Sequence, residues 1–438
     1  MKITFLGAGS TVFVRNLIGD CMQVEALQGT EFALYDIDAS RLTQSLRVLE
    51  GIRDKLGAKA TFTCHCGVEQ RKDAMRGASF VINAVQIGGY EPTFKSDFTT
   101  PNKYDLRQTI GDTVGVGGII RALRTIPVLE DFTRDMAEVC PDALFLNYTN
   151  PMAILSGYLQ RYTPIKTVGL CHSVQVCSKN LMTRLHMVDY MEGRRETIFG
   201  INHMAWLVDI RDKDGNDLYP EIKRRIEAHE YDDDCHDLVR FDYIRRLGYY
   251  CTESSTHQAE YNPFYIKRNY PELIDRYKIP LDDYIRRAHR NIDLWNDAYD
   301  ALLRDPEPPV RSREYASRII EAMVTNVPYC IHGNVLNTGN LIDELPTEAC
   351  VEVPILVDGM GLHPCKMGAL PLQCAAMCRG RINMELLTIK AARTHCREDV
   401  YRAAMFDPHT AAELSIDDIR SLMDDLLADQ QYMLPEYK

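Results

Sequence analysis

The chain has 438 residues, a formal net charge of −12 and 14 cysteines. The charges are spread along the chain, which excludes the clustered Lys and Arg of a nucleic-acid-binding surface, and no apolar run reaches the length of a membrane span. The length predicts two or three domains, and a start directly in a strand-like run, without a secretory signal, predicts a cytoplasmic protein with reduced thiols.

The first element is a short apolar run, Lys2 to Leu6, that fits a buried parallel strand. Gly7-Ala8-Gly9-Ser10-Thr11 follows, and a helical pattern extends to about Leu27. In this context Gly7 permits the tight turn, Gly9 lets the backbone approach a pyrophosphate, and the helix start favours phosphate charge. Val12 replaces the third glycine of the usual motif. We nevertheless predict a dinucleotide site at residues 7–11.

A second strand is expected from Glu31 to Ile37, with Asp36 near its end. A carboxylate there can accept hydrogen bonds from an adenosine ribose and would repel a 2′-phosphate. The pattern therefore predicts NAD rather than NADP as the cofactor. The alternative is an ordinary βαβ turn with a surface Asp.

Strands and helices alternate through about residue 170. Further strands are expected at Phe80–Val85, Ala143–Asn147 and Lys166–Leu170, and Gln86 opens a glycine turn placed near the cofactor. This alternation predicts an α/β fold with a Rossmann-type doubly wound parallel sheet and ligands at the carboxyl ends of its strands. We assign residues 1–195 to this NAD-binding domain.

Cys64-His65-Cys66 looks like a metal motif, because alternate residues of a strand face the same way. No second pair of ligands lies nearby in the sequence, so we interpret it as a structural strand.

The second half, 196–438, has a mixed pattern and is predicted to form an α+β catalytic domain that shares one cleft with the first. Trp206 to Arg211 and Leu218 flank Asp214-Gly215, which predicts a hairpin. Helices are expected at about 235–247, 281–303, 312–325, 384–404 and 416–428. The last begins after Ser415 with a variant of the capping box.

Cys171 and His172 directly follow a predicted strand. Neighbours on a strand point to opposite faces, so the two are not expected to bind one ion together. We interpret Cys171 as a thiolate ligand of a divalent metal, His203 as a second ligand, and His172 as an acid or hydrogen-bond donor. Such a site leaves positions open for substrate oxygens. The alternative is a buried thiol and two histidines with ordinary partners.

Two other stretches can supply polar groups. Asn150 precedes Pro151 after a strand, where it can bind a substrate hydroxyl or the nicotinamide ribose, or serve only as a turn residue. The run from Glu253 to Tyr261 is dense in titratable groups and is a candidate source of a general base, or else a capped helix start.

Taken together, these motifs resemble those of glycoside hydrolase family four, the NAD- and manganese-dependent glycosidases. The resemblance extends from Lys2 to about Pro435 and is strongest for the α-galactosidases of the family, which hydrolyse melibiose. Its pieces are GAGST at 7–11, LYDID at 34–38, QIGGY at 86–90, NYTNPMA at 147–153, GLCHSVQ at 169–175, GINHMAW at 200–206, TESS-H-AEY at 252–261, GNVLNTG at 333–339 and DPHTAAEL at 407–414.

The resemblance implies a fold like that of lactate and malate dehydrogenases, Mn²⁺ bound by Cys171 and His203, and a sugar contact from Asn150. It also implies that the residue after the cysteine is the acid. Relatives that act on phosphorylated α-glucosides carry Asp there, whereas this chain has His172. Tyr261 is the nearest match to the family's tyrosine base, with His257 and Glu260 as rivals.

The implied reaction is redox-neutral hydrolysis: oxidation at C3 by NAD⁺, loss of the C2 proton, elimination, water addition and re-reduction. Such NAD-dependent enzymes are an exception to the mechanism of most glycosidases, which use a pair of catalytic carboxylates. The resemblance further implies a homodimer or homotetramer that takes a small α-galactoside.

Three alternatives are open. The same mechanism could act on an α-galacturonoside or a 6-phospho-α-glucoside, and a phosphate would need cations such as Arg286-Arg287 or Lys267-Arg268. A plain NAD-dependent dehydrogenase for a hydroxy acid or sugar would show net NADH formation. A non-catalytic NAD-binding sensor would bind the cofactor without turnover.

Overall fold

The structure is a computed structural model that describes residues 1–10, 12–308, 310–312 and 314–438. Thr11, one of the predicted cofactor residues, lies outside the described residues.

Six parallel strands form the first half of the sheet, in the order β3-β2-β1-β4-β5-β6. This is the strand order of dinucleotide-binding folds, and the prediction of a doubly wound parallel sheet is confirmed. The strands are β1 (Lys2–Leu6), β2 (Glu31–Asp36), β3 (Thr61–Cys66), β4 (Phe80–Asn83), β5 (Leu144–Asn147) and β6 (Thr167–Gly169). Most of their residues are buried because helices cover both faces of the sheet.

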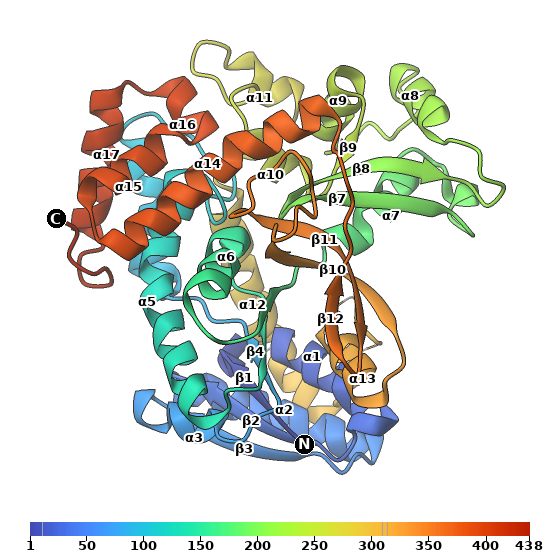
Figure 1. Ribbon diagram of the computed structural model, residues 1–438, viewed down its shortest axis with the longest axis vertical. Helices are drawn as coiled ribbons and strands as arrows, with labels where there is room; N and C mark the ends of the chain where they lie inside the picture. The colour runs from blue at the N-terminus through green and yellow to red at the C-terminus, as the bar shows by residue number, and fades with distance from the viewer. Residues whose placement is uncertain (11, 309, 313) are drawn as a thin grey trace.

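Two groups of helices flank this sheet (Figure 1). In one group, α1 (Val12–Met22) packs on α2 (Ala39–Leu56), and α12 (Asp283–Arg304) and α13 (Ala316–Thr325) join them from the second half of the chain. In the other, the long α5 (Gly115–Val139) packs on α3 (Arg71–Met75), α6 (Met152–Tyr162) and α14 (Leu372–Thr394). The C-terminal half therefore supplies helices to both groups.

Antiparallel strands continue the same sheet beyond β6, in the order β10-β11-β7-β8-β9, with β12 paired to β11. Their bounds are β7 (Arg195–Ile201), β8 (Met204–Arg211), β9 (Tyr250–Cys251), β10 (Tyr329–Leu336), β11 (Cys350–Asp358) and β12 (Gly361–Pro364). Because β10 pairs with β6, one continuous sheet joins the two halves of the chain.

The remaining helices are α4 (Lys95–Asn102), α7 (Ser173–Arg184), α8 (Tyr219–Glu227), α9 (Leu238–Leu247), α10 (Ser255–Glu260), α11 (Glu272–Arg276), α15 (Arg397–Met405), α16 (Pro408–Glu413) and α17 (Ile416–Asp429). Among the helices of the described residues, none combines the length and apolar character needed to cross a membrane.

The predicted hairpin at Asp214-Gly215 is wrong in its second arm. The turn exists, with Gly215 at φ 90°, but only a single bridge joins Arg211 to Asp217 before α8 begins. The partner of β8 is β7, which precedes it and is joined to it by a two-residue turn at 202–203. The apolar alternation of β8 indicated a strand but not which neighbour it would pair with.

The single helix predicted at 384–404 is also wrong. The chain forms α14, which begins much earlier at Leu372, and α15, with His395 in the left-handed conformation between them. The buried face of the early turns of α14 includes the charged Arg381, while the apolar Leu372 is exposed, so this stretch lacks the one-sided apolar pattern that identifies a surface helix.

Two smaller predictions are confirmed. Cys64 to Cys66 lie in strand β3, at the edge of the sheet. The Ser415 hydroxyl accepts a hydrogen bond from the backbone N–H of Asp418 and caps α17.

Candidate active site

The parallel strands bring most of the predicted site residues to one edge of the sheet. Asp36 ends β2, Gly7 follows β1, Gln86 follows β4, Asn150 follows β5 and Cys171 follows β6. Since β2, β1, β4, β5 and β6 are consecutive neighbours, these residues form a row along the carboxyl edge. At about 4.8 Å per strand the row extends for about 19 Å.

The glycine turn lies at the start of this row, against β2 and β4. Gly7 has φ 87°, and a Cβ there would lie 2.8 Å from the carbonyl oxygen of Ala84. The N–H of Gly9 donates to Asp36 Oδ2 at 2.6 Å, and a Cβ on Gly9 would lie 2.7 Å from that oxygen. Ala8 and Ser10 complete a short 3₁₀ turn before α1. The turn thus has no side chain at Gly7 and Gly9 and packs closely against Ala84 and Asp36, at the position where a pyrophosphate approaches in folds of this order.

Gln86 and Asn150 occupy the middle of the row. Gln86 is exposed just after β4. Asn150 is partly buried, and its Nδ2 lies 3.4 Å from Asp112 Oδ2, while its carbonyl oxygen accepts from Arg121 Nε at 3.1 Å. Both side chains stand between the glycine turn and Cys171, where an extended ligand along the row would pass.

The far end of the row holds a group of three metal-ligand types. Cys171, His203 and Glu253 each offer a donor atom, and these atoms lie within 4.8 Å of one another. They come from three segments: Cys171 follows β6, His203 occupies the β7–β8 turn at φ 60°, and Glu253 follows β9 at φ 64°. The antiparallel half of the sheet therefore brings His203 and Glu253 to the end of the parallel half.

Two of the three side chains in this group have the protonation state that a cation needs. Burial lowers the pKa of His203 to about 4, so the imidazole is neutral and has a lone pair to donate. Burial acts to raise the pKa of Glu253, but His257, His203 and His172 hold it down at about 2, so the carboxylate is ionised. Burial, with Glu352 and Glu253 next, raises the pKa of the Cys171 thiol, which a bound cation would reverse.

Tyr261 and His257 lie beside the metal-ligand group. The Tyr261 hydroxyl is 3.1 Å from His203 Nδ1, and the Arg381 guanidinium lies 4.6 Å over the Tyr261 ring. His257 Nδ1 contacts Glu253 Oε1 at 3.2 Å and the Ser254 hydroxyl at 2.8 Å. Burial raises the pKa of Tyr261 well above 10 although Arg381 acts to lower it.

Glu260, the third rival for the base, has a different role. Its carboxylate accepts from the backbone N–H groups of Thr109, Ile110 and Gly111 at 2.7, 3.2 and 3.0 Å. Burial raises its pKa to about 7, but the oxygens are engaged in holding the 109–111 loop. Glu260 is therefore an anchor of that loop.

His172 lies just before α7, with its side chain largely exposed to solvent. Its side chain is 55% exposed, and Nδ1 lies 3.4 Å from Glu314 Oε1. Cys171 is instead buried and its thiol points to Ser173 Oγ at 3.3 Å. The expectation that these neighbours face different ways agrees with this geometry.

Sequence reasoning missed two residues of the site. Glu253 was recognised only as part of a polar run, since its place beside Cys171 and His203 depends on strands distant in sequence. No motif in the sequence pointed to Arg381. Its guanidinium lies over the Tyr261 ring and donates to the carbonyl oxygen of Asn202 at 3.1 Å.

The donors fit the two groups that the sequence implies. A thiol, a neutral imidazole and a carboxylate are ligands of borderline divalent ions, and three ligands leave coordination positions for other oxygens. The bare glycine turn beside Asp36 fits a dinucleotide without a 2′-phosphate.

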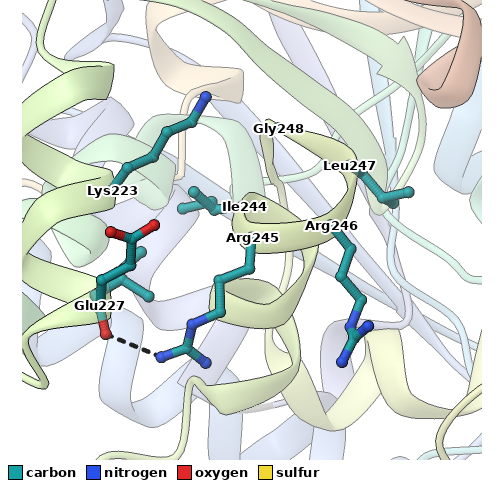
Figure 2. Close-up of a pocket in the computed structure, with 8 residues that line it drawn as sticks. Lys223, Glu227, Ile244, Arg245, Arg246, Leu247 and Gly248 are labelled. Carbon is teal, nitrogen blue, oxygen red and sulfur yellow. Dashed lines mark hydrogen bonds between the residues drawn. The ribbon is translucent and has the colours of Figure 1, made fainter.

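A separate hollow of about 270 Å³ lies between α8 and α9 (Figure 2). Lys223, Glu227, Arg245 and Arg246 line it, and Arg245 donates to the carbonyl oxygen of Ile226. None of its lining residues belongs to the row or the metal-ligand group, so we do not connect it with catalysis.

Comparisons with known proteins cover nearly the whole chain. Residues 2–187 match the model of family 4 glycosyl hydrolases, and residues 198–410 match the model of their C-terminal domain. The chain is 55% identical to an alpha-galactosidase of Bacillus subtilis (strain 168) over the full length of both chains. It is 35% identical to an alpha-galactosidase of Rhizobium meliloti (strain 1021), over 100% of this chain and 89% of the relative.

A solved structure resembles the whole chain. A 6-phospho-alpha-glucosidase from gut microorganisms, in complex with NAD and Mn²⁺, has a TM-score of 0.80 at 21% identity, over 100% of this chain and 99% of that chain.

Proposed function

Because this chain belongs to family 4 of the glycosyl hydrolases, we propose that it is an NAD- and Mn²⁺-dependent α-galactosidase that hydrolyses terminal α-galactosides such as melibiose. The main support is the arrangement along the carboxyl edge of the sheet. A glycine turn without side chains lies toward one end of the row, and the thiol, imidazole and carboxylate of the metal-ligand group lie at the other. The named relatives supply the choice of sugar, since the two reported above are α-galactosidases.

Gly7, Ala8, Gly9, Ser10, Asp36 and Gln86, together with Thr11, would hold NAD⁺, and Cys171, His203 and Glu253 would hold Mn²⁺. When bound, NAD⁺ supplies reversible oxidation at the sugar C3, which acidifies the C2 hydrogen with no net redox change, and Mn²⁺ supplies a Lewis acid for the sugar oxygens.

The chain's own residues then move two protons. Tyr261 would take the C2 proton. Its hydroxyl lies 3.1 Å from His203 Nδ1, and Arg381 over its ring acts against the burial that raises its pKa. His172 would give a proton to the leaving oxygen; its largely exposed side chain and its position next to Cys171 support this role. Asn150 would hold the sugar between them.

The phosphorylated substrate is the less favoured alternative. Arg287 Nε pairs with Asp283 at 2.5 Å, and Lys267 Nζ pairs with Glu413 at 2.5 Å. Arg286 donates to the carbonyl oxygen of Leu281. A phosphate would have to compete with these partners, whereas a neutral galactoside needs no such cation.

The test is hydrolysis of a chromogenic α-galactoside by desalted protein. NAD⁺, Mn²⁺ and a thiol reductant are supplied together and then omitted one at a time, with α-galacturonoside and 6-phospho-α-glucoside as parallel substrates. We expect loss of galactoside hydrolysis on each omission and no accumulation of NADH. Activity that survives without NAD⁺, or net NADH formation, would overturn the proposal.

We also propose a cytoplasmic homodimer or homotetramer with a nucleotide-binding domain at 1–195 and a catalytic domain at 196–438. The many reduced thiols support the compartment, and light scattering would measure the oligomeric state.

A further inference from the structure

Glu352 occupies a special position in the sheet. On β11 it pairs with Asn334 of β10 on one side and with Gly200 of β7 on the other, and Asn334 pairs in turn with Gly169 of β6. These four residues form a line across four adjacent strands. The line starts two residues before Cys171 and ends three residues before His203, so Glu352 lies between the strand ends that bear these ligands.

The carboxyl group of Glu352 is incompletely satisfied. The residue is 0% exposed, and Oε1 is 3.4 Å from Asn334 Nδ2. Among the described residues, Oε2 has no hydrogen-bond partner. A buried carboxyl oxygen without a donor or cation costs free energy, so a retained one calls for an explanation.

Charged groups of both signs influence Glu352. Burial raises its pKa to about 8 and Glu253 acts in the same direction, whereas Arg381 and His172 act to lower it. Glu352 is itself among the groups that oppose ionisation of Cys171. Once Cys171 and Glu352 are ionised, a thiolate and two carboxylates share the buried end of the row. Such a set of like charges is stable only when a cation sits among them.

We propose that Glu352 is a positioning residue for the divalent-metal centre, which it supports from the sheet between the strands that carry Cys171 and His203. This role rests on the proposed metal site. The carboxylate increases the affinity of the three ligands for the ion through its charge and through hydrogen bonding around them, as outer carboxylates do at other metal centres.

The test is titration of purified full-length protein with MnCl₂ alone, without sugar or NAD⁺, followed by calorimetry and by the electron paramagnetic resonance of free Mn²⁺. Glu352→Gln keeps the size and the Asn334 contact but removes the charge. We expect its Kd for Mn²⁺ to rise by roughly 10- to 100-fold, with the Kd for NAD⁺ unchanged.

Glu385→Gln is the matched control, because Glu385 is also a buried acid, on α14, and pairs with Arg381 at 3.1 Å outside the line. We expect its Mn²⁺ affinity to stay within about twofold of the wild type. An unchanged Mn²⁺ affinity in Glu352→Gln would overturn the role of Glu352. Should that variant fail to fold, Glu352→Met, which also lacks the charge and has a similar length, replaces it, and wild-type affinity there would overturn the role equally.

Failure of the proposed function gives a different result. If the wild type itself does not bind Mn²⁺, the metal centre is wrong, and the role of Glu352 is overturned with it.

Discussion

The proposed nucleotide site and the proposed metal site, here the nucleotide end and the metal end of the row, are built in different ways. At the nucleotide end the binding surface is backbone: a glycine turn joins consecutive elements β1 and α1, and Asp36 of the adjacent β2 closes it. At the metal end the binding surface is side chains, which come from Cys171, His203 and Glu253 on segments separated by about thirty and fifty residues. The two ends should therefore respond to different mutations.

The two ends also differ in where non-glycine residues adopt an unusual backbone conformation. His203 and Glu253, at the metal end, both have positive φ, which is uncommon for residues other than glycine. The antiparallel strands hold these turns against the end of the parallel sheet, so the second half of the chain acts as the frame that completes the site.

The largest expected effect is at the metal end. Cys171→Ser removes the thiolate and with it Lewis-acid stabilisation of several kcal/mol, so kcat/KM for an α-galactoside should fall by about 10³-fold or more. Calorimetry should show loss of Mn²⁺ binding with NAD⁺ binding retained. An equal loss of Mn²⁺ binding and NAD⁺ binding would show that the two ends are not independent.

The converse change is at the nucleotide end. In Gly9→Ala the new Cβ would lie 2.7 Å from Asp36 Oδ2, so the turn must shift, and we expect the Kd for NAD⁺ to rise by about 10- to 100-fold. Mn²⁺ binding should stay as in the wild type. Gly29→Ala, where no atom lies within 4 Å of the new Cβ, is the control and should bind both ligands normally.

A third change separates proton transfer from metal binding. His172→Gln should lower the rate on melibiose by about 10²- to 10⁴-fold, because the leaving sugar needs a proton. An activated nitrophenyl galactoside should lose far less, since its leaving group departs as an anion. The comparison of initial rates on the two substrates checks this, and equal losses would remove His172 from the role of acid.

The smallest effect concerns the stability of the antiparallel part of the sheet, which contains β10. Burial lowers the pKa of His332 on β10 to about 4, against about 6.5 in an unfolded chain. The unfolded chain binds this proton more readily, so stability present above pH 6.5 is lost as the pH falls toward 4. We expect His332 to account for about 2 kcal/mol of the difference in unfolding free energy between pH 7.5 and pH 5.

Urea unfolding of His332→Gln at both pH values measures the contribution of His332 to the unfolding free energy. His229→Gln, at an exposed histidine, is the control. An unaltered pH dependence in His332→Gln would show that His332 does not titrate in this way.

The same contrast explains what sequence alone could predict. The glycine turn of the proposed nucleotide end could be predicted because its strand, turn and helix are consecutive, so Gly7, Gly9 and Asp36 form a local pattern. The metal end was only half predictable. Cys171 and His203 stood out as ligand types, but Glu253 joins them through the pairing of β8 with β9, which no local pattern reveals.

The errors have a similar origin. The apolar pattern identified β8 but not its pairing with β7, and the charged Arg381 on the buried face of α14 concealed the start of that helix. Pairing and burial depend on contacts distant in sequence, which a local period does not record.

An α-galactoside with deuterium at C2, hydrolysed in ordinary water with NAD⁺ and Mn²⁺ present, shows whether both ends of the row act in one redox-neutral reaction. We expect slower initial hydrolysis than for the unlabelled sugar, galactose that has exchanged its C2 deuterium for solvent hydrogen, and no accumulated NADH. Galactose that keeps all its deuterium at C2 would contradict the proposed reaction.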